Sequence, residues 1–195
     1  MAFPVVLDTC VLFPIALTDL LLRLAEAKAF RPLWSNEILA ELERNLVSKG
    51  KATPVRARKR VTRMREHFPD ALVENYEDLI PIMTCDPKDR HVAAAAVRSN
   101  AELIVTFNLK DFPVTALRDY DLEAISPDDF LLDQLDLFPE VTLDCLRRQA
   151  TDYANPKVTI LELVRTLENL GLPLFTAAVR DRIAADDQSF VTHHG

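Results

Sequence analysis

The sequence predicts an α/β fold, in which helices flank a central, mostly parallel sheet, followed by an extension made of helices alone. Short apolar runs rich in β-branched residues, at 3–7 and 103–107, alternate with stretches of helical periodicity, as is typical of α/β proteins. From Ser126 onward, helical patterns follow one another without a further strand signal. We therefore expect a globular domain over residues 1–125, a helical extension over 126–190 and a disordered tail at 191–195.

Each expected helix begins at a side chain that can cap it. Ser, Thr, Asp and Asn accept hydrogen bonds from first-turn backbone N–H groups, and proline is favoured in the first turn. The expected helix starts are Thr18, Ser35 with Asn36, Thr53 with Pro54 (a basic helix to His67), Asp86 with Pro87 (an alanine-rich helix) and Ser126 with Pro127. Strands are expected at 3–7, 72–73, 103–107 and 122–125, and breaks within the extension near Pro139, 155–156 and 171–173.

Composition excludes several classes of site. The chain has 195 residues and only three glycines, so it contains no Walker loop, dinucleotide-binding turn or nucleophile elbow. Three distant cysteines and four histidines without metal-ligand spacing argue against a disulfide framework and a zinc site. No apolar run reaches the roughly 20 residues of a membrane span, and the N-terminus lacks a signal-peptide pattern. A cytoplasmic protein that uses Asp and Glu for any chemistry is expected.

The formal net charge of −7 conceals a basic segment. Residues 44–66 carry nine Lys and Arg against a single Glu, a sum of +8, which leaves −15 for the rest of the chain. Such a segment can bind phosphates even on an acidic protein, because exposed charges more than about 8–10 Å apart are largely screened from one another. It also suits a solvated helix face, and both interpretations stay open. The candidate phosphate-binding residues are Arg56, Arg58, Lys59, Arg60 and Arg63.

Several polar side chains follow expected strands or begin expected helices. Asp8 directly follows the first strand, and Asn108 and Asp111 follow the strand that ends near residue 107. Ligand sites of parallel sheets lie beyond these carboxyl ends. Asp86 and Asp89 begin the alanine-rich helix, with Asp86 as the expected N-cap. Each of these residues also suits a plain turn or cap, so that alternative stays open.

A further acid belongs to the helix that Ser35 opens. Glu41 and Glu43 flank its apolar stripe on opposite sides, so periodicity does not choose between them. Carboxylates gathered without a His or Cys cluster suit a hard cation such as Mg²⁺ or Mn²⁺. Without a cation, packed carboxylates would repel one another and their pKa values would rise. Such a site beside a basic helix suits metal-assisted phosphodiester hydrolysis.

These motifs together resemble the PIN domain, and in particular the VapC-type toxins of bacterial toxin–antitoxin pairs that carry a helical C-terminal extension. The similar segments are 5–9 (Val-Val-Leu-Asp-Thr), 35–46 with Glu41, 86–89 (Asp-Pro-Lys-Asp) and 103–113, which contains Thr-Phe-Asn-Leu-Lys-Asp-Phe-Pro. The last run and the D-x-x-D are the most specific. The resemblance covers residues 3–125 well and the extension more loosely.

The resemblance implies a three-layer PIN fold and a Mg²⁺- or Mn²⁺-dependent endoribonuclease, commonly a homodimer, that a cognate antitoxin (VapB-like or other) holds inactive. The implied site residues are Asp8, Glu41 and Asp89 as metal ligands, Asp111 or Asn108 completing the site, and Asp86 and Thr106 in support. Many family members have Asp where this chain has Asn108, so Asp111 is a candidate for that role. The five basic candidates would bind RNA phosphates.

Two other functions stay open at this point. A phosphatase of the haloacid-dehalogenase type would use Asp8 as its nucleophile, but it needs a second Asp where this chain has Cys10. A PIN-like module that binds RNA or a protein without cleaving is consistent with Asn108. The acidic residues of the extension make it a poor RNA platform and favour a role facing a protein.

Overall fold

In a computed structural model of the chain, five strands form one sheet in the order β3-β2-β1-β4-β5, and every pairing is parallel. The structure describes residues 2–154 and 156–192, with side chains described as far as residue 185. The strands are β1 (Pro4–Leu7), β2 (Arg31–Ser35), β3 (Leu72–Val73), β4 (Leu103–Val105) and β5 (Glu123–Ile125). The predicted parallel central sheet is confirmed.

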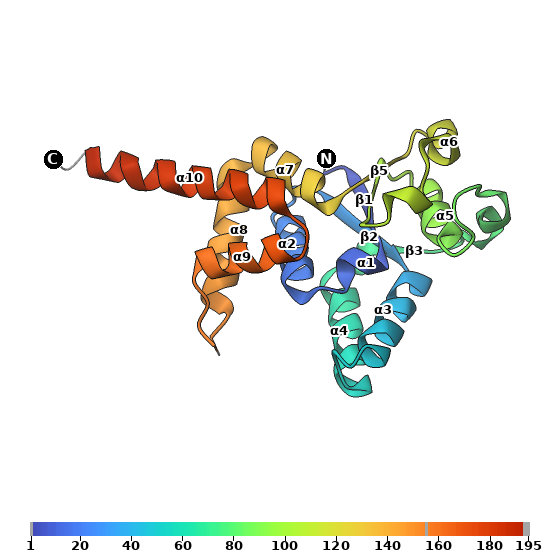
Figure 1. The fold of residues 1–195 in the computed structure, drawn as a ribbon. Helices are drawn as coiled ribbons and strands as arrows, with labels where there is room; N and C mark the ends of the chain where they lie inside the picture. Colours follow the sequence, from blue (N-terminus) through green and yellow to red (C-terminus); the bar gives the residue numbers. More distant parts are fainter. Residues whose placement is uncertain (1, 155, 193–195) are drawn as a thin grey trace.

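Helices cover both faces of this sheet (Figure 1). The connecting helices are α1 (Thr9–Leu12), α2 (Ile15–Glu26), α3 (Asn36–Ser48), α4 (Pro54–His67), α5 (Arg90–Arg98) and α6 (Val114–Leu117), with the short 3₁₀ helices η1 (Pro69–Ala71), η2 (Glu77–Ile82), η3 (Leu109–Asp111) and η4 (Arg118–Tyr120). Parallel crossovers are right-handed, so the steps from β1 to β2 and β3 put α2 and α3 on one face. The connection from β3 to β4 runs back across the sheet and puts α5 on the other face. This is the predicted three-layer arrangement.

The strand order reverses between β1 and β4, and this reversal brings their carboxyl ends together. Leu7 is paired with Val105, and the Asp8 backbone N–H donates to the Val105 carbonyl over 3.2 Å. Asp8 and Thr106, the next residues, therefore lie at the topological switch point, where open parallel sheets bind their ligands.

Strand β2 is an element that the sequence analysis missed. Its residues, Arg31-Pro32-Leu33-Trp34-Ser35, begin with a charge and a proline and do not alternate, so they carry neither strand signature. Helix α1, of four residues, was missed as well. Tertiary pairing with β1 on one side and β3 on the other is what makes residues 31–35 a strand.

Two predicted helix starts are wrong. Helix α2 begins at Ile15, and the Thr18 hydroxyl, inside the helix, donates to the carbonyls of Leu12 and Pro14 over 2.9 and 3.0 Å. Helix α5 begins at Arg90 with Asp89 as its N-cap residue, whereas Asp86 Oδ1 accepts from the Lys88 N–H over 2.9 Å within a separate turn. In both places a residue of the capping type is present, but its side chain forms a hydrogen bond with a backbone group other than the first-turn N–H groups of the helix. The caps at Ser35, Thr53 and Ser126 are confirmed.

The predicted helical extension consists of α7 (Pro127–Leu137), α8 (Pro139–Asp152), α9 (Ile160–Asn169) and α10 (Pro173–Thr192). It packs on α2, and α10 extends away from the rest of the molecule (Figure 1). The Phe130 ring lies edge-on to that of Phe30, with centroids 5.1 Å apart, and Gln149 Nε2 donates to the Ala16 carbonyl over 2.8 Å. The extension therefore shares a core with the sheet domain.

Helix α10 continues to Thr192, so the first two residues of the tail expected at 191–195 are helical, and residues 193–195 lie outside the described part of the chain. Among the helices that the structure describes, none is long and apolar enough to cross a membrane.

Candidate active site

A cavity of about 270 Å³ opens at the switch point between β1 and β4. Three carboxylates from distant parts of the chain line it: Asp8 after β1, Glu41 on α3 and Asp89 before α5. The other lining residues are Thr9, Cys10, Phe13, Asn45, Lys49 and Asn108. The structure thus brings together the three residues that the resemblance implied as metal ligands.

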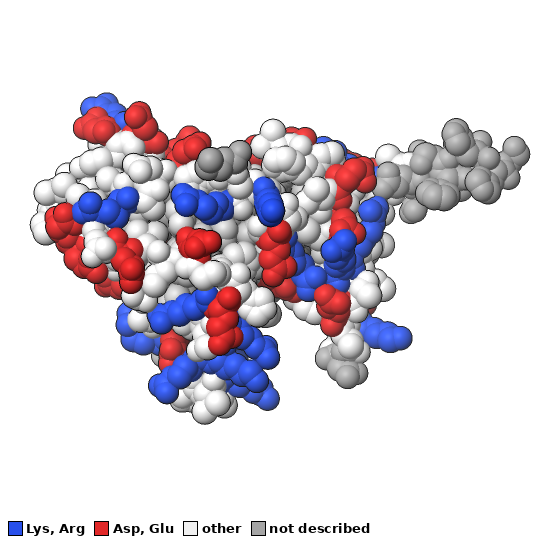
Figure 2. Space-filling view, turned by 180° about the vertical axis from the view of Figure 1, so that it is seen from behind, with Lys and Arg blue, Asp and Glu red and all other residues white. Residues whose placement is uncertain are grey.

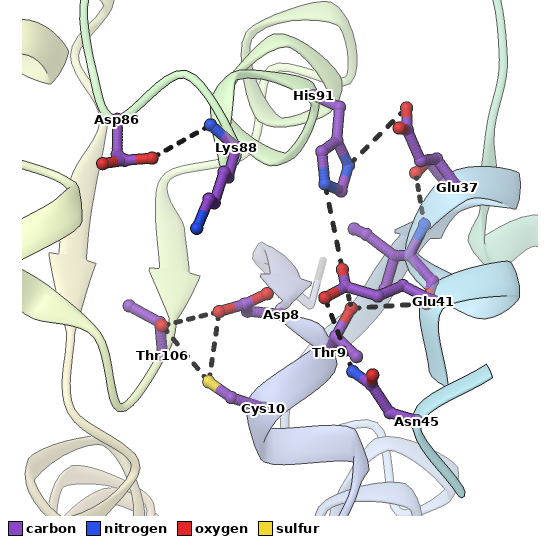
Figure 3. Close-up of polar contacts among 12 residues, drawn as sticks. Asp8, Thr9, Cys10, Glu37, Glu41, Asn45, Asp86, Lys88, His91 and Thr106 are labelled. Atoms are coloured by element: carbon purple, nitrogen blue, oxygen red, sulfur yellow. Dashed lines mark hydrogen bonds and ion pairs between the residues drawn. The ribbon is translucent and has the colours of Figure 1, made fainter. Parts of the chain in front are cut away.

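The Asp8 carboxylate is the most buried of the three, at 3% exposed. Its Oδ2 accepts from the Thr106 hydroxyl over 2.7 Å and from the Cys10 thiol over 3.1 Å (Figure 3). Burial raises the pKa of Asp8, the two side-chain hydrogen bonds oppose that rise, and the charge of Glu41 adds to it. Fixed by two donors, the carboxylate has one orientation.

Cys10 and Thr106 form the support of Asp8. Burial, and then the neighbouring charge of Asp8, raise the pKa of the Cys10 thiol to about 12, so the thiol is protonated and donates. The Cys10 sulfur also accepts from the Phe107 N–H over 3.2 Å, and Thr106 Oγ1 accepts from the Asn108 N–H over 3.0 Å. Thr106, which the resemblance implied in support of the site, thus contacts Asp8 directly. The contact of Cys10 with Asp8 was missed because the spacing of Cys10 matches no motif.

Glu41, not Glu43, faces the cavity. Glu41 Oε2 accepts from the Thr9 hydroxyl over 2.9 Å, and Oε1 lies 3.5 Å from Asn45 Nδ2. Glu43 turns away and forms an ion pair with Arg58 at 3.5 Å. The packing of α3 against α1 and α4 decides which flank of the helix meets the site, and the periodicity of α3 alone does not contain that information.

Asp89 is the third carboxylate of the cavity, and its surroundings disfavour its charged form. It is half-buried and has no capping hydrogen bond from its side chain. Burial, and then the charges of Asp8, Asp111, Asp86 and Glu41, together raise its pKa to about 6. Like charges held close together disfavour ionisation, so the three carboxylates destabilise one another when no cation is present.

The remaining predicted site residues lie at the rim. Asn108 lines the cavity, whereas Asp111 does not, although its charge acts on Asp89. The Asp86 N–H donates to the Asp111 carbonyl over 3.0 Å, which ties the loop before α5 to the loop after β4. Asp86 itself stays outside the cavity lining. The Lys88 side chain extends toward the same space (Figure 3).

His91 is a neighbour of the site that the sequence analysis did not single out. The ring is buried, at 7% exposed, with Nε2 4.0 Å from Glu41 Oε2 and Nδ1 3.9 Å from Glu37 Oε2 (Figure 3). Nδ1 has no hydrogen-bond partner among the described residues. A single histidine in an alanine-rich helix gives no signal of this role, because its two carboxylate neighbours lie on α3.

The carboxylates fit a hard divalent cation by their chemistry. Asp8, Glu41 and Asp89 provide oxygen ligands, which Mg²⁺ and Mn²⁺ prefer, and a cation would offset the repulsion that raises the pKa of Asp89. As placed, no group of three or more His, Cys, Asp or Glu within the described residues is close enough to hold one ion. For three of them to bind one ion, the side chains would have to move closer together.

The basic candidates lie outside the acidic cavity. Figure 2 shows Lys and Arg gathered over the lobe that α3 and α4 form. A hollow of about 820 Å³, larger than the acidic cavity, lies between α2, α4 and the end of α8, and Arg56, Lys59 and Arg63 line it. Arg58, exposed and paired with Glu43, lines a neighbouring hollow. These four residues form a basic surface, which we call the α4 basic face, beside the site rather than in it.

Arg60 differs from the other four. Its guanidinium donates to the carbonyls of Leu12 and Phe13 over 2.6 and 3.3 Å and to the Thr18 hydroxyl over 2.9 Å. Burial lowers its pKa. The side chain therefore joins α4 to the turn between α1 and α2, and its hydrogen-bonding capacity is used within the protein.

Comparison with known proteins finds two matching family models and one similar protein. A model described as "PIN domain" matches residues 4–110, and a model described as "VapC50 C-terminal domain" matches residues 127–181. A protein of Mycobacterium tuberculosis (strain ATCC 25618 / H37Rv), named "Putative ribonuclease VapC50", is 48% identical over 112 residues, which are 56% of this chain and 64% of that relative. The match thus spans less than two thirds of the relative. The comparison with solved structures produced no match.

Proposed function

The chain belongs to the PIN-domain family, and from this premise we propose that it is a metal-dependent endoribonuclease that acts as the toxin of a toxin–antitoxin pair. One observation carries the proposal. Asp8, Glu41 and Asp89, which are 33 to 81 positions apart in the chain, line a single cavity at the switch point of the sheet. The name of the Mycobacterium relative, "Putative ribonuclease VapC50", supports the same activity. The PIN-domain match leaves the haloacid-dehalogenase alternative without support.

Asp8, Glu41 and Asp89 are the residues that would hold Mg²⁺ or Mn²⁺, with Asn108 and Asp111 at the rim as candidates to complete the set. When bound, the ion activates water and stabilises the negative charge that develops on the phosphate. The protein's own contribution is orientation. Asp8 is held by Thr106 and Cys10, and Glu41 is held by Thr9, so two of the three ligands need little reordering to bind.

The α4 basic face is the proposed contact for RNA phosphates. Arg56, Arg58, Lys59 and Arg63 are exposed, and phosphate contacts of this kind position a nucleic acid without specifying its sequence. Arg60 is not included, since its guanidinium is bonded within the protein. Recognition of a particular RNA would then depend on its shape and unpaired bases.

We assign catalysis to residues 1–125 and a partner-facing role to the extension, 126–190. The match of residues 127–181 to the VapC50 C-terminal domain supports that division. A cognate antitoxin and a second copy of the chain in a homodimer are the proposed protein partners. An antitoxin with a basic side chain could occupy the acidic cavity, where it would form charge-assisted hydrogen bonds with the carboxylates.

The test is cleavage of total cellular RNA by the purified protein with Mg²⁺, with Mn²⁺ and with EDTA. Asp8→Asn removes one proposed ligand, and Asp70→Asn, an exposed acid in η1, is the matched control. We expect discrete fragments that require a metal, are absent with Asp8→Asn and persist with Asp70→Asn. Equal products from the wild type and Asp8→Asn with both metals would refute the nuclease. Metal-independent RNA binding without turnover would establish the non-catalytic module instead.

A further inference from the structure

One face of α3 carries a lysine as well as a glutamate that line the acidic cavity. Glu41, Asn45 and Lys49 follow one another at intervals of four residues, and all three line the cavity. Lys49 is the C-cap residue of α3, and eight residues of helix rise about 12 Å. The face therefore leads from a proposed metal ligand to a positive charge at the far end of the same cavity. Among the nine lining residues, all within the described part of the chain, Lys49 is the sole Lys or Arg.

Lys49 is not neutralised by the carboxylates of that cavity. Within the described residues, no Asp or Glu lies at ion-pair distance from its ammonium. The ammonium lies instead over the Phe13 ring, with Nζ 5.0 Å from the centroid, an arrangement in which the ring attracts the cation. The carboxyl end of α3 favours a cation at this position as well. The charge is thus held in place and stays available to an anion.

Phe13 is itself fixed by the fold. Its carbonyl accepts from Arg60, which also bonds the preceding carbonyl of Leu12. Arg60 therefore holds the turn that carries the ring, and the ring holds Lys49. A flexible lysine side chain is in this way given a preferred position at the edge of the cavity.

We propose that Lys49 binds a phosphate of the RNA strand that neighbours the phosphate at the three carboxylates, and that Phe13 is a positioning residue for its ammonium. This inference rests on the proposed ribonuclease function. A cavity with three carboxylates repels a polyanion, and a cation at its edge offsets that repulsion for a strand entering there. The distance along α3 separates Lys49 from the proposed metal ligands, so its partner is a second phosphate of the strand. An ammonium provides three donors and acts on phosphate as a point charge.

A different role for Lys49 is to counterbalance the carboxylates and so stabilise the folded protein. The two roles predict different results. If Lys49 is a counter-charge, its loss lowers the stability of the protein, and the change in KM does not depend on which linkage of the substrate is uncharged. A phosphate contact acts on one linkage of the substrate and leaves the melting temperature nearly unchanged, because Lys49 is exposed.

The experiment compares Lys49→Met with Lys157→Met, which removes the same charge from an exposed position in the loop between α8 and α9. The substrates are single-stranded oligoribonucleotides with one cleavage site and one uncharged methylphosphonate linkage, moved along the strand. For the wild type and Lys157→Met we expect KM to rise about tenfold when one particular linkage near the cleavage site is uncharged. For Lys49→Met we expect KM to be raised already with the unmodified strand and not to rise further when that linkage is uncharged. Its kcat should stay within about twofold of the wild-type value.

Phe13→Leu should raise KM for the unmodified strand by a smaller factor than Lys49→Met does, because it removes the ring and leaves the lysine. The salt dependence of binding should become shallower by about 0.7 in Lys49→Met, as for the loss of one phosphate contact to a single strand. The proposal is overturned if Lys49→Met responds to every uncharged linkage as Lys157→Met does, or if it mainly lowers the melting temperature.

Binding of the same oligonucleotides in the Asp8→Asn background separates this proposal from the ribonuclease itself. Suppose that the wild type cleaves nothing, but that the affinities of Asp8→Asn with and without Lys49→Met respond differently to an uncharged linkage at one position only. The nuclease proposal then fails and the phosphate contact stands. If the wild type cleaves RNA, but Asp8→Asn with and without Lys49→Met respond alike to every uncharged linkage, the phosphate contact fails and the nuclease proposal stands.

Discussion

The hydroxyl of Thr106 donates a 2.7 Å hydrogen bond to Oδ2 of Asp8, although the two residues are 98 positions apart in the chain. Both directly follow paired strands, β4 and β1, and both are buried. The parallel pairing of these strands thus orients the acid on which the proposed chemistry depends.

Replacing Thr106 with valine keeps the shape of the side chain and removes this hydrogen bond. We expect RNA cleavage to fall by about 10- to 100-fold, as when a partner of a metal ligand is lost, with a higher metal concentration needed for half-maximal rate. A metal titration of the cleavage rate measures both effects. Thr106→Ser keeps the donor and should retain most activity, and equal losses in the two variants would assign Thr106 to packing alone.

Replacing Asp89 with asparagine should raise the melting temperature in EDTA at pH 7 while it abolishes cleavage. Burial and neighbouring carboxylates raise the pKa of Asp89 to about 6 in the folded protein, compared with an ordinary value near 3.8, so ionisation of Asp89 disfavours folding. The wild type therefore loses stability relative to the variant as pH rises from about 4 through 6.

Melting of both proteins in EDTA between pH 3.5 and pH 7.5 measures this difference. It should be near zero at the acidic end, where Asp89 is protonated in both the folded and unfolded states, and largest above pH 6. Addition of Mg²⁺ should stabilise the wild type more than the variant. A variant that melts below the wild type at pH 7 without metal would contradict the mutual repulsion of the three carboxylates.

Arg60 and Arg63 are three positions apart on α4, and replacement by methionine should affect different properties at the two positions. We expect a loss of stability at Arg60 and weaker RNA binding at Arg63. Arg60→Met removes hydrogen bonds to three buried or half-buried oxygens and should cost about 2–3 kcal/mol of unfolding free energy. Arg63→Met, at an exposed position, should stay within about 0.5 kcal/mol but weaken RNA binding and reduce its salt dependence. Urea unfolding and RNA titrations at several salt concentrations measure these quantities. Equal stability of the two variants would show that Arg60 is a surface residue in solution.

The amino end of α10 is capped from another helix, because the Asp128 carboxylate accepts from the N–H groups of Leu174 and Phe175 over 3.0 and 2.8 Å. Asp128→Ala should therefore lower the unfolding free energy by about 1–3 kcal/mol. Urea unfolding measures this change. Asp133→Ala on the same helix is the control. Asp133 is exposed, and partial desolvation and neighbouring acids raise its pKa, so its removal should not destabilise the protein. Equal losses in both variants would exclude Asp128 as the cap of α10.

Local signals were enough to predict several elements of this protein. The apolar runs at β1 and β4 and the caps at Ser35, Thr53 and Ser126 match the structure, because a strand core and a cap depend on residues only a few positions apart. Strand β2 is different: its residues become a strand by pairing with β1 and β3, and no local pattern contains that pairing.

The sequence by itself determined that carboxylates follow the buried strands, that a basic helix comes after α3, and that helices alone make up the last third of the chain. The tertiary structure decided which of these side chains meet. It turns Glu41 rather than Glu43 toward Asp8, uses Arg60 inside the protein, and places Lys49 over Phe13 at the edge of an acidic cavity. The physical reason is that the direction of a helical side chain depends on which face of the helix is packed, and that face is chosen by residues tens of positions away.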